Sequence, residues 1–229
     1  IFEAYAAARS AGFSRINIDL MFGLPGQEWE SALNDLEQAI SLDPEHISWY
    51  QLTIEPNTIF YSYPPSIPDE DTIAEIARRG NKMLKDSGFE QYEVSAFSVP
   101  GESAVHNLNY WEFGDYIGIG AGAHGKSTRD NGIFRSQKTR MPSDYMVDSN
   151  VSLIEVDAKD ITLEFLMNAL RLTNGFELNL YSERTGLHQE NLDPFIDRAL
   201  QRGFIHFDQN RLVPSERGRN FLNDMLLLL

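Results

Sequence analysis

The sequence predicts an α/β fold with parallel strands over residues 1–150 and a small, mainly helical, winged-helix-like domain over residues 155–229. The first part alternates short β-rich runs with helical segments, which is typical of strands that pair in parallel through crossover helices. The second part has several helical segments followed by a short β-hairpin. With 42% hydrophobic residues, the 229-residue chain can bury a substantial core in one large or two small domains.

The first 150 residues contain three predicted strands. A helical composition over residues 1–10 precedes them and ends before Gly12. The predicted strands are 16–22, 47–54 and 92–97, and the helices between them are 28–42 and 69–87. Ligands of parallel sheets and barrels bind beyond the carboxyl ends of the strands. We therefore expect Asp19, Thr53 and the residues after Phe97 to face one common site.

Asp19 is an acidic residue inside an apolar, β-rich run, so the sequence predicts that it is buried. A buried carboxylate is costly unless hydrogen-bond donors reach it, and ribose hydroxyls or backbone amides are suitable donors. Asp19 is therefore expected either to bind a ligand or to cap amides of the adjacent loop.

From residue 126 onwards the alternating pattern ends. Asp130-Asn131-Gly132 separates two β-prone runs and predicts a hairpin turn. A short helix is predicted from Pro142, and residues 149–157 have the composition of a linker. In the winged-helix-like domain, the predicted helices are 161–172, 178–184 and 192–201, the hairpin joins 203–207 to 211–213, and a last helix begins near Ser215.

Charge and composition exclude several functions. The chain has 19 basic and 34 acidic residues, a formal charge of −15, so no nucleic-acid partner is expected. It has no cysteine, so these residues provide no disulfide, no thiolate nucleophile, and no cysteine ligand for zinc or an iron–sulfur cluster. The longest apolar run, residues 225–229, is too short to cross a bilayer. We expect a cytoplasmic protein without an integral membrane segment.

A dense stretch from His106 to Ser127 contains several possible ligand-binding motifs. Residues 120–127 satisfy the phosphate-loop pattern Gly-x-x-x-x-Gly-Lys-Ser, and the glycines from Gly118 onwards suggest a dinucleotide site. Both sites require a helix after the glycines, whereas the sequence predicts a hairpin there. We interpret the phosphate-loop match as accidental, and at least two of the four glycines as positions where the backbone packs closely. A P-loop nucleotide-binding protein is kept as the weakest functional alternative.

His106 offers a different chemistry. A neutral imidazole is a good iron ligand, and Tyr110 and Trp111 offer flat apolar surface for a macrocycle. Taken alone, a histidine beside aromatic residues is more often structural. His124, among the glycines, is the second histidine of interest. The remaining histidines have no comparable setting and are expected to be structural or at the surface: His46, His188 and His206.

Four motifs in a fixed order give the chain a family resemblance. They are IDLMFGLPGQ at 18–27, SWYQLTIEPNT at 48–58, HNLNYW at 106–111 and GIGAGAHG at 118–125. Together they resemble the haem-chaperone branch of the oxygen-independent coproporphyrinogen III oxidase-like radical SAM family. The resemblance covers essentially the whole chain, and the tail from about residue 160 resembles the small C-terminal domain of that family.

The resemblance implies that the intact protein has an incomplete, TIM-like radical SAM barrel of six strands. In the family, three cysteines in a Cys-x-x-x-Cys-x-x-Cys loop near the N-terminus hold a 4Fe-4S cluster, and this chain has no cysteine. The chain opens with a helical composition and no cap, so we expect a cut inside a longer protein. It would then comprise the C-terminal half of the barrel plus the C-terminal domain. Alone, it is expected neither to assemble the cluster nor to perform radical chemistry.

The resemblance also implies a pocket for S-adenosyl-L-methionine (SAM). Asp19, Met21, Thr53 and His124 match positions that line this pocket in the related oxidase. Asp19 agrees with the oxidase in identity, whereas the other three differ from its smaller or aliphatic residues. The polar Thr53 and His124 leave the particular SAM contacts of the oxidase open.

In the chaperone branch the His-Asn-x-x-Tyr-Trp motif marks the haem site. By this resemblance His106 is the ligand of the haem iron, and Asn107, Tyr110 and Trp111 complete the site. The implied function is a haem chaperone that uses SAM and a 4Fe-4S cluster and transfers haem to acceptor proteins such as respiratory enzymes. The alternative is an oxygen-independent coproporphyrinogen III oxidase, in which a SAM-derived radical begins the decarboxylation of propionate side chains in porphyrin biosynthesis.

Overall fold

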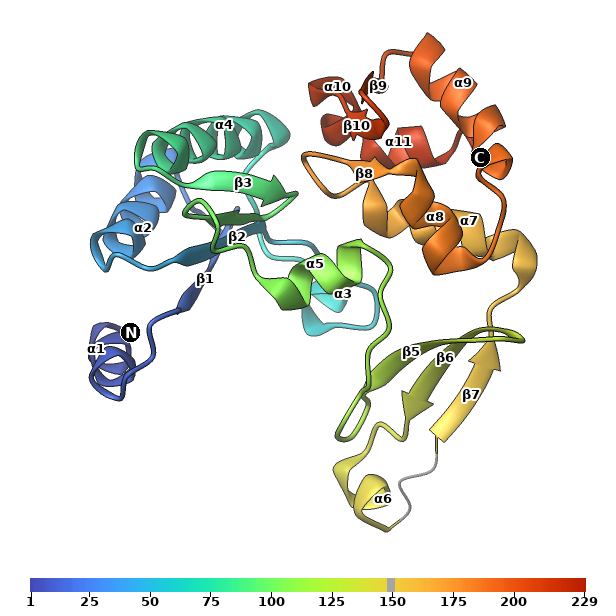
Figure 1. Ribbon diagram of the computed structural model, residues 1–229. Helices are drawn as coiled ribbons and strands as arrows, with labels where there is room; N and C mark the ends of the chain where they lie inside the picture. Colours follow the sequence, from blue (N-terminus) through green and yellow to red (C-terminus); the bar gives the residue numbers. More distant parts are fainter. Residues whose placement is uncertain (148–150) are drawn as a thin grey trace. The chain divides into compact units, whose positions relative to one another are not determined.

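The structure is a computed structural model that describes residues 1–147 and 151–229 (Figure 1). By compactness the chain divides into two units, 1–104 and 105–229. Within the described residues, no helix is both long enough and apolar enough to cross a membrane.

The first unit is built on a four-stranded sheet in the order β1-β2-β4-β3. Its strands are β1 (Asn17–Phe22), β2 (His46–Gln51), β3 (Glu90–Glu93) and β4 (Ala96–Ser98). β1 and β2 pair in parallel, with Asn17 opposite His46 and Phe22 opposite Gln51. The predicted parallel pairing of the first two strands is therefore confirmed.

The prediction of one continuous strand over residues 92–97 is wrong. The segment instead ends β3 and forms a tight turn at Val94 and Ser95, and β4 then runs antiparallel to both β2 and β3. The carboxylate of Glu93 accepts hydrogen bonds from the N–H and the hydroxyl of Ser95, at 3.2 and 3.3 Å. Local side-chain bonds of this kind stabilise a turn in place of a strand.

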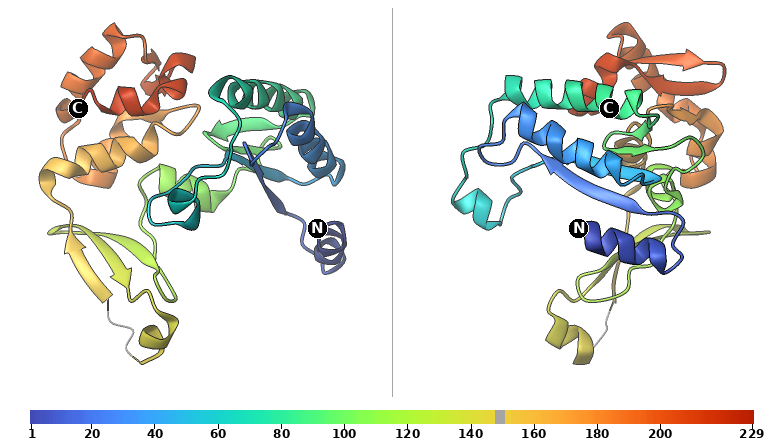
Figure 2. Two further views of the ribbon diagram at one scale, coloured as in Figure 1. Left: turned by 180° about the vertical axis from the view of Figure 1, so that it is seen from behind. Right: turned by 90° about the vertical axis from the view of Figure 1, so that its left-hand side faces the viewer.

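Helices α2 (Trp29–Ser41) and α4 (Glu70–Asp86) lie along one face of this sheet (Figures 1 and 2). The core lies between that face and the helices. Its fully buried members include Ile47 from β2, Leu36 from α2 and Ile76 from α4. Trp49 is buried, and a side chain at Gly80 of α4 would overlap its indole ring. Glycine at this position lets α4 approach β2 closely.

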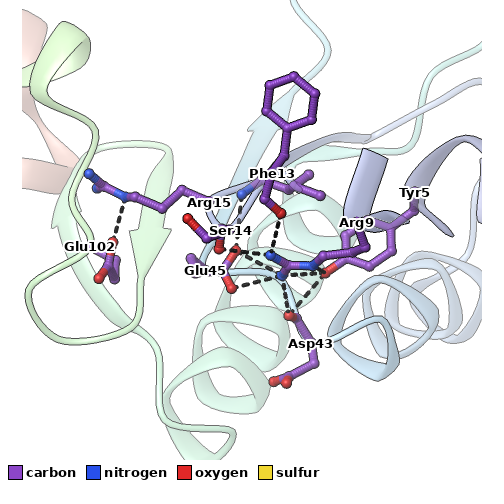
Figure 3. A network of polar contacts seen from close by, with 9 residues as sticks. Tyr5, Arg9, Phe13, Ser14, Arg15, Asp43, Glu45 and Glu102 are labelled. Carbon is purple, nitrogen blue, oxygen red and sulfur yellow. Dashed lines mark hydrogen bonds and ion pairs between the residues drawn. The ribbon is translucent and has the colours of Figure 1, made fainter. Parts of the chain in front are cut away.

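Helix α1 (Phe2–Ser10) has no buried residue and is held by the polar network in Figure 3. The guanidinium group of Arg9 donates to both carboxylate oxygens of Glu45, at 2.7 and 2.8 Å, and to the Tyr5 hydroxyl and the Asp43 carbonyl. Burial disfavours the charged form of Glu45, but the hydrogen bonds from Arg9 and from the Ile16 N–H outweigh it and lower the Glu45 pKa. Charge pairing therefore fixes α1 near the start of β2.

The second unit contains a three-stranded antiparallel sheet in the order β5-β6-β7. Its strands are β5 (His124–Arg129), β6 (Gly132–Lys138) and β7 (Val151–Glu155). Helix α6 (Pro142–Val147) follows β6 in the chain. The predicted hairpin is confirmed by the pairing of Arg129 with Gly132, and α6 begins at the predicted Pro142.

The linker predicted over 149–157 is wrong where the structure describes it, because residues 151–155 form β7 and pair with β6. Residues 149 and 150 lie outside the described part. The exposed edge of β6 has backbone donors and acceptors that require partners, and an extended polar segment can supply them. A composition typical of linkers does not reveal this pairing.

The rest of the second unit is mainly helical with a small sheet, as predicted for residues 155–229 but not for α5. The helices are α5 (Val105–Trp111), α7 (Ala158–Ala169), α8 (Leu178–Thr185), the 3₁₀ turn η1 (Gln189–Leu192), α9 (Asp193–Gln201), α10 (Glu216–Asn220) and α11 (Leu222–Leu226). The small sheet has the order β8-β10-β9, with β8 (Phe176–Glu177), β9 (Ile205–Asp208) and β10 (Arg211–Pro214). β9 and β10 are the predicted hairpin, while β8 was not predicted. The predicted last helix is divided at Phe221.

One core joins the β5-β6-β7 sheet to the helical segment. Phe165 of α7 is fully buried and makes edge-to-face contacts with Phe113 and Phe176, with ring centroids 5.8 and 5.0 Å apart. Ile133 of β6 and Val156 belong to the same buried cluster. This shared core explains why the compact division falls at residue 104, while the domain boundary between residues 150 and 155 stays a prediction.

Candidate functional site

The sheet of the first unit has one apolar and one polar face. Along β1, Ile18 and Phe22 are buried under the helices, Met21 is half-buried, and Asn17 and Asp19 are exposed on the other face. The prediction of a buried Asp19 is therefore wrong. Successive side chains of a strand point to opposite faces, and here the helices cover only one of them.

A chain of hydrogen bonds crosses the polar face from β1 to β3. Asn17 Nδ2 donates to Asp19 Oδ1 at 2.7 Å, Asn17 Oδ1 lies 2.6 Å from His46 Nδ1, and His46 Nε2 lies 2.7 Å from the Tyr92 hydroxyl. We call these four residues the polar row. His46 is buried, at 5% exposure, so it is a structural histidine of the kind predicted and not a surface one.

The electrostatic setting of His46 favours the neutral ring. Burial lowers the pKa of His46, and the charge of Arg15 lowers it further. The charge of Asp19 has the opposite effect but does not reverse the shift.

Asp19 and Met21 also line a largely apolar cavity of about 320 Å³ beside β1. Leu24, Leu42 and Phe2 contribute to its wall. The cavity therefore combines apolar surface with the carboxylates of Asp19 and Asp35, which suits a ligand that has both flat apolar and hydrogen-bonding parts.

Thr53 lies two residues beyond β2. The N–H of Leu52 donates to the Phe22 carbonyl at 2.8 Å, which keeps this segment beside the end of β1. The exposed hydroxyl of Thr53 donates to Glu55 Oε1 at 3.0 Å. The next turn of helix, α3 (Ile59–Ser62), is capped by the hydroxyl oxygen of Thr58. Asp19 and Met21 thus lie on β1, and Thr53 follows its parallel neighbour β2, while the common site of the three residues stays a prediction.

His106 lies on α5, a helix that the sequence analysis did not assign. Its side chain is exposed, and the ring meets that of Tyr110, one turn later, edge to face with centroids 4.8 Å apart. The Tyr110 ring lies 4.4 Å from that of Tyr116, and the Tyr116 hydroxyl accepts a hydrogen bond from Arg135 at 3.3 Å. Arg135 pairs with Glu164 of α7. We call His106, Tyr110 and Tyr116 the aromatic ladder. Through Arg135 it links the exposed imidazole to β6 and α7.

Trp111 has a different position on the same helix. The guanidinium group of Arg171, which lies just beyond the end of α7, is 5.3 Å from the centre of its ring. Its Nε1 is buried and has no hydrogen-bond partner among the described residues. Trp111 therefore helps to pack α5 against α7, while Asn107, on the same helix, is half-buried.

The turn after α5 is tightly constrained. Phe113 adopts a left-handed backbone with φ of 56°, and a side chain at Gly114 would overlap Asn109. The amide of Asn109 donates to the Asp115 carbonyl at 3.0 Å. The second asparagine of the HNLNYW motif thus has a structural part in ending the helix.

Lys126, the lysine of the phosphate-loop pattern, is buried inside this turn. Only 1% of its side chain is exposed, and its ammonium group donates to the Phe113 carbonyl at 2.9 Å, Asp115 Oδ1 at 2.8 Å and Thr128 Oγ1 at 3.0 Å. Burial lowers the Lys126 pKa, while Asp115 acts in the opposite direction. Burial also opposes ionisation of Asp115, but the hydrogen bonds from Lys126 and Thr128 outweigh it and lower the Asp115 pKa. Because Ser127 follows within β5 and not at a helix N-terminus, the P-loop alternative is excluded.

The glycine-rich stretch is a loop that leads into β5, and its last glycine, Gly125, lies within that strand. Side chains at Gly118 and Gly125 would overlap the His124 backbone and Ser136, whereas Gly120 and Gly122 have positive φ. The interpretation of close backbone packing is therefore confirmed for two glycines. His124 is exposed at the first position of β5, in the second unit. Asp19, Met21 and Thr53 belong to the first unit, so a pocket that they share with His124 stays a prediction.

Within the described residues, no group of three or more histidine, aspartate and glutamate side chains could hold a metal ion.

Comparisons with known proteins agree with this architecture. The family model described as the HemN C-terminal domain matches residues 156–221. Heme chaperone HemW of Escherichia coli (strain K12) is 46% identical over 231 residues, which cover 99% of this chain and 61% of that protein. Heme chaperone HemW of Bacillus subtilis (strain 168) is 31% identical, with 98% and 61% covered. The chain is related to the HemW proteins. It spans about 61% of their length.

A solved structure reports that coproporphyrinogen III oxidase (HemN) from Escherichia coli is a radical SAM enzyme. It matches this chain with a TM-score of 0.75 and 17% identity, over 99% of this chain and 57% of that one. At this identity the likeness concerns the fold alone, and it confirms the predicted α/β class. The family resemblance inferred from the four HemW-like motifs is confirmed by the HemW relatives themselves.

Sequence reasoning missed two groups of residues. It did not identify the anchoring role of Lys126, because the phosphate-loop pattern offered a competing explanation. It also did not connect Asn17, His46 and Tyr92, which are 29 and 46 residues apart. An Asn-x-Asp pair on one strand was the only signal for the polar row.

Proposed function

We propose that this chain is part of a radical SAM haem chaperone that binds haem through His106 and delivers it to acceptor proteins such as respiratory enzymes. The similarity to relatives named heme chaperone HemW over nearly the whole chain supports the proposal. Haem is the cargo in this function.

The single structural observation behind the proposal is the setting of His106. Its side chain is exposed, and in the described part of the chain neither ring nitrogen has a hydrogen-bond partner. An exposed, unpartnered imidazole can coordinate iron without first breaking a bond. The neighbouring Tyr110 ring lies on the same helix face, one turn away, and offers flat surface for a macrocycle.

The other motif residues support this arrangement indirectly. Trp111 packs α5 against α7 through Arg171, so we assign it to holding the helix that presents His106. Asn107 is assigned to the haem site by the family resemblance. We propose that the Lys126–Asp115 pair fixes the turn that follows α5 and so holds the C-terminal end of this helix in place.

For SAM we propose Asp19, Met21 and Thr53 as pocket residues of the first unit, with His124 as a further candidate. The exposed carboxylate of Asp19 and the apolar wall near Met21 fit the donors and the flat ring of a nucleoside. In this family SAM supplies a radical when it is bound with a 4Fe-4S cluster. The cluster itself does not fit this chain, which has no cysteine, so its ligands would have to lie in other residues of the intact protein.

The test is an optical titration of the chain and of the intact protein with haem, repeated with His106→Ala. We expect the dissociation constant of the variant to rise at least about tenfold, with loss of the histidine-ligated spectrum. His188→Ala is the matched control, since His188 is also an exposed histidine of the second unit. Unchanged binding and spectrum in His106→Ala would refute the ligand assignment.

The alternative function is that of an oxygen-independent coproporphyrinogen III oxidase, which the family resemblance of the sequence also implies. It predicts that the intact, reconstituted protein decarboxylates coproporphyrinogen III. Formation of that product at a rate independent of His106 would favour the oxidase over the chaperone.

A further inference from the structure

The polar row of the first unit points to a further role for three residues outside the predicted pocket. We propose that His46, Asn17 and Tyr92 are positioning residues that hold the Asp19 carboxylate in one orientation and leave its Oδ2 for a hydroxyl or ammonium donor of the ligand. The ligand part of this inference rests on the proposed function of Asp19 in SAM binding.

The donor and the acceptor of each hydrogen bond in the polar row can be assigned by starting from the Asp19 carboxylate. An ionised carboxylate only accepts hydrogen bonds, so the Asn17 atom at 2.7 Å from Asp19 Oδ1 must be the amide nitrogen. The other Asn17 atom is then the carbonyl oxygen, and His46 Nδ1, at 2.6 Å, must donate to it. In a neutral imidazole Nε2 is then the acceptor, and the Tyr92 hydroxyl donates to it at 2.7 Å. Every donor in the row therefore points toward Asp19.

Strand pairing makes this orientation difficult to reverse. The parallel register puts Asn17 opposite His46 and Asp19 opposite Ser48. The Ser48 hydroxyl also donates to Asn17 Oδ1, at 3.1 Å. A flipped Asn17 amide would lose both of these acceptor contacts and would place its oxygen against the carboxylate, which repels it.

Burial adds rigidity at the far end. His46 is 5% exposed and Tyr92 is 9% exposed, so both rings are held by their surroundings as well as by hydrogen bonds. Hydrogen bonds in such an environment are stronger than in water and polarise one another along the chain. The fixed rings of Tyr92 and His46 therefore restrict the orientation of Asn17 and, through it, of the exposed Asp19 carboxylate.

The exposed end is what distinguishes a positioning role from a purely structural one. Asp19 uses Oδ1 for Asn17, and within the described residues no hydrogen bond reaches Oδ2. The same residue lines the apolar cavity beside β1. If the polar row only stabilised the fold, it would not need to end at a carboxylate that uses one oxygen for Asn17 and lies beside a cavity.

The first measurement uses no ligand. Long-range proton–nitrogen spectra of the full chain near neutral pH should show His46 with the proton on Nδ1, which is the less common form of a free neutral imidazole. Carbon–carbon couplings should show one χ1 rotamer for Asp19. Asn17→Ser should let that rotamer average, and Tyr92→Phe should do so to a smaller extent. Ser98→Ala, which removes a hydroxyl of the same sheet outside the row, should change neither quantity.

The second measurement is calorimetric titration with SAM as the probe. We expect Asn17→Ser to weaken binding about tenfold and Tyr92→Phe about threefold, since each removes one hydrogen bond that supports a charged group. Ser98→Ala should bind like the wild type. A loss of overall packing would lower the melting temperature without averaging the Asp19 rotamer, so the two readouts separate stability from positioning.

Asp19→Asn distinguishes failure of the proposed function from failure of this inference. If SAM affinity is absent in the wild type or unchanged in Asp19→Asn, the cofactor role of Asp19 is refuted, and the Nδ1 proton and the Asp19 rotamer decide the positioning role alone. If Asp19→Asn weakens binding but Asn17→Ser and Tyr92→Phe do not, the pocket stands and the positioning role is refuted. A proton on Nε2 of His46 in the wild type would refute it as well.

Discussion

Two histidines of this chain have opposite environments. His46 is buried in a sheet, with hydrogen bonds at both ring nitrogens, whereas His106 is exposed on a short helix, and neither of its nitrogens has a hydrogen-bond partner among the described residues. A ring whose nitrogens are both occupied can orient its neighbours but cannot bind a metal without breaking a bond. A ring with free nitrogens can bind a metal but needs other groups to hold it in place.

The supports of the two rings differ accordingly. His46 is fixed by β1, β2 and β3 directly. His106 depends on contacts that hold α5 at its other end: the aromatic ladder, the Trp111–Arg171 stack and the Lys126–Asp115 pair. This comparison predicts that substitutions near His106 change the packing that holds α5 in place. Substitutions at His46 instead remove hydrogen bonds made by the ring itself.

The largest effect is expected for Lys126→Met. Removing a buried ammonium group leaves the Phe113 carbonyl and the Thr128 hydroxyl without their bonds to Nζ, and we expect a loss of about 3 kcal/mol in the free energy of unfolding. Urea denaturation measures it, and haem affinity should fall in parallel. Lys138→Met, on the neighbouring strand, is the control. An unchanged midpoint of urea unfolding would show that other contacts hold α5 in place.

His46→Ala compared with His106→Ala tests the contrast directly. Removing the buried ring removes its hydrogen bonds to Asn17 Oδ1 and to the Tyr92 hydroxyl, and we expect a loss of about 2 kcal/mol in the free energy of unfolding. Removing the exposed ring should cost less than about 0.5 kcal/mol. Thermal and urea denaturation of both variants measure the difference, and similar losses would contradict the contrast.

The pH dependence of stability provides a smaller effect. Because the pKa of His46 is lower in the folded state than the unperturbed value of 6.5, the unfolded chain binds more protons below that pH. The contribution is fully present above about pH 6.5 and is lost as pH falls toward the folded pKa. His46→Gln keeps a donor and an acceptor but does not titrate, so its stability should vary less between pH 7 and 5.5. Equal slopes for the two proteins would count against a neutral, buried His46.

The carboxylates whose pKa is lowered do not interfere in this range. Glu45 and Asp115 contribute stability above their unperturbed values of 4.5 and 3.8, and lose it only as pH falls through the lower folded values. Asp19 and Arg15 are the charges that act on His46, in opposite directions.

The smallest effect is expected for Arg171→Ala. The stack on Trp111 is worth about 0.5–1 kcal/mol, and its loss should also change the fluorescence of this tryptophan. Differential scanning calorimetry and fluorescence spectra measure the two effects. Arg202→Ala, an exposed arginine at the end of α9, should change neither. If Arg171→Ala matches this control, the stack does not help to hold α5.

Most of the fold was predictable because it depends on local patterns. Helical spacing gave α2 and α4, and the Asp130-Asn131-Gly132 turn gave the β5–β6 hairpin. The division of 92–97 into two strands was not predictable, because it depends on Glu93 bonding Ser95 and on β4 finding an antiparallel place beside β2. The pairing of 151–155 with β6 likewise depends on a distant edge.

For the site, the sequence by itself determined which chemistry was present: an imidazole beside aromatic rings at His106, an acid at Asp19, and glycines before β5. Only the tertiary structure decided what each group touches. It made Lys126 a buried anchor in place of a phosphate ligand, and it exposed Asp19 while connecting it to His46. The reason is that burial and hydrogen bonding arise between residues far apart in the chain, whereas a motif records only neighbours.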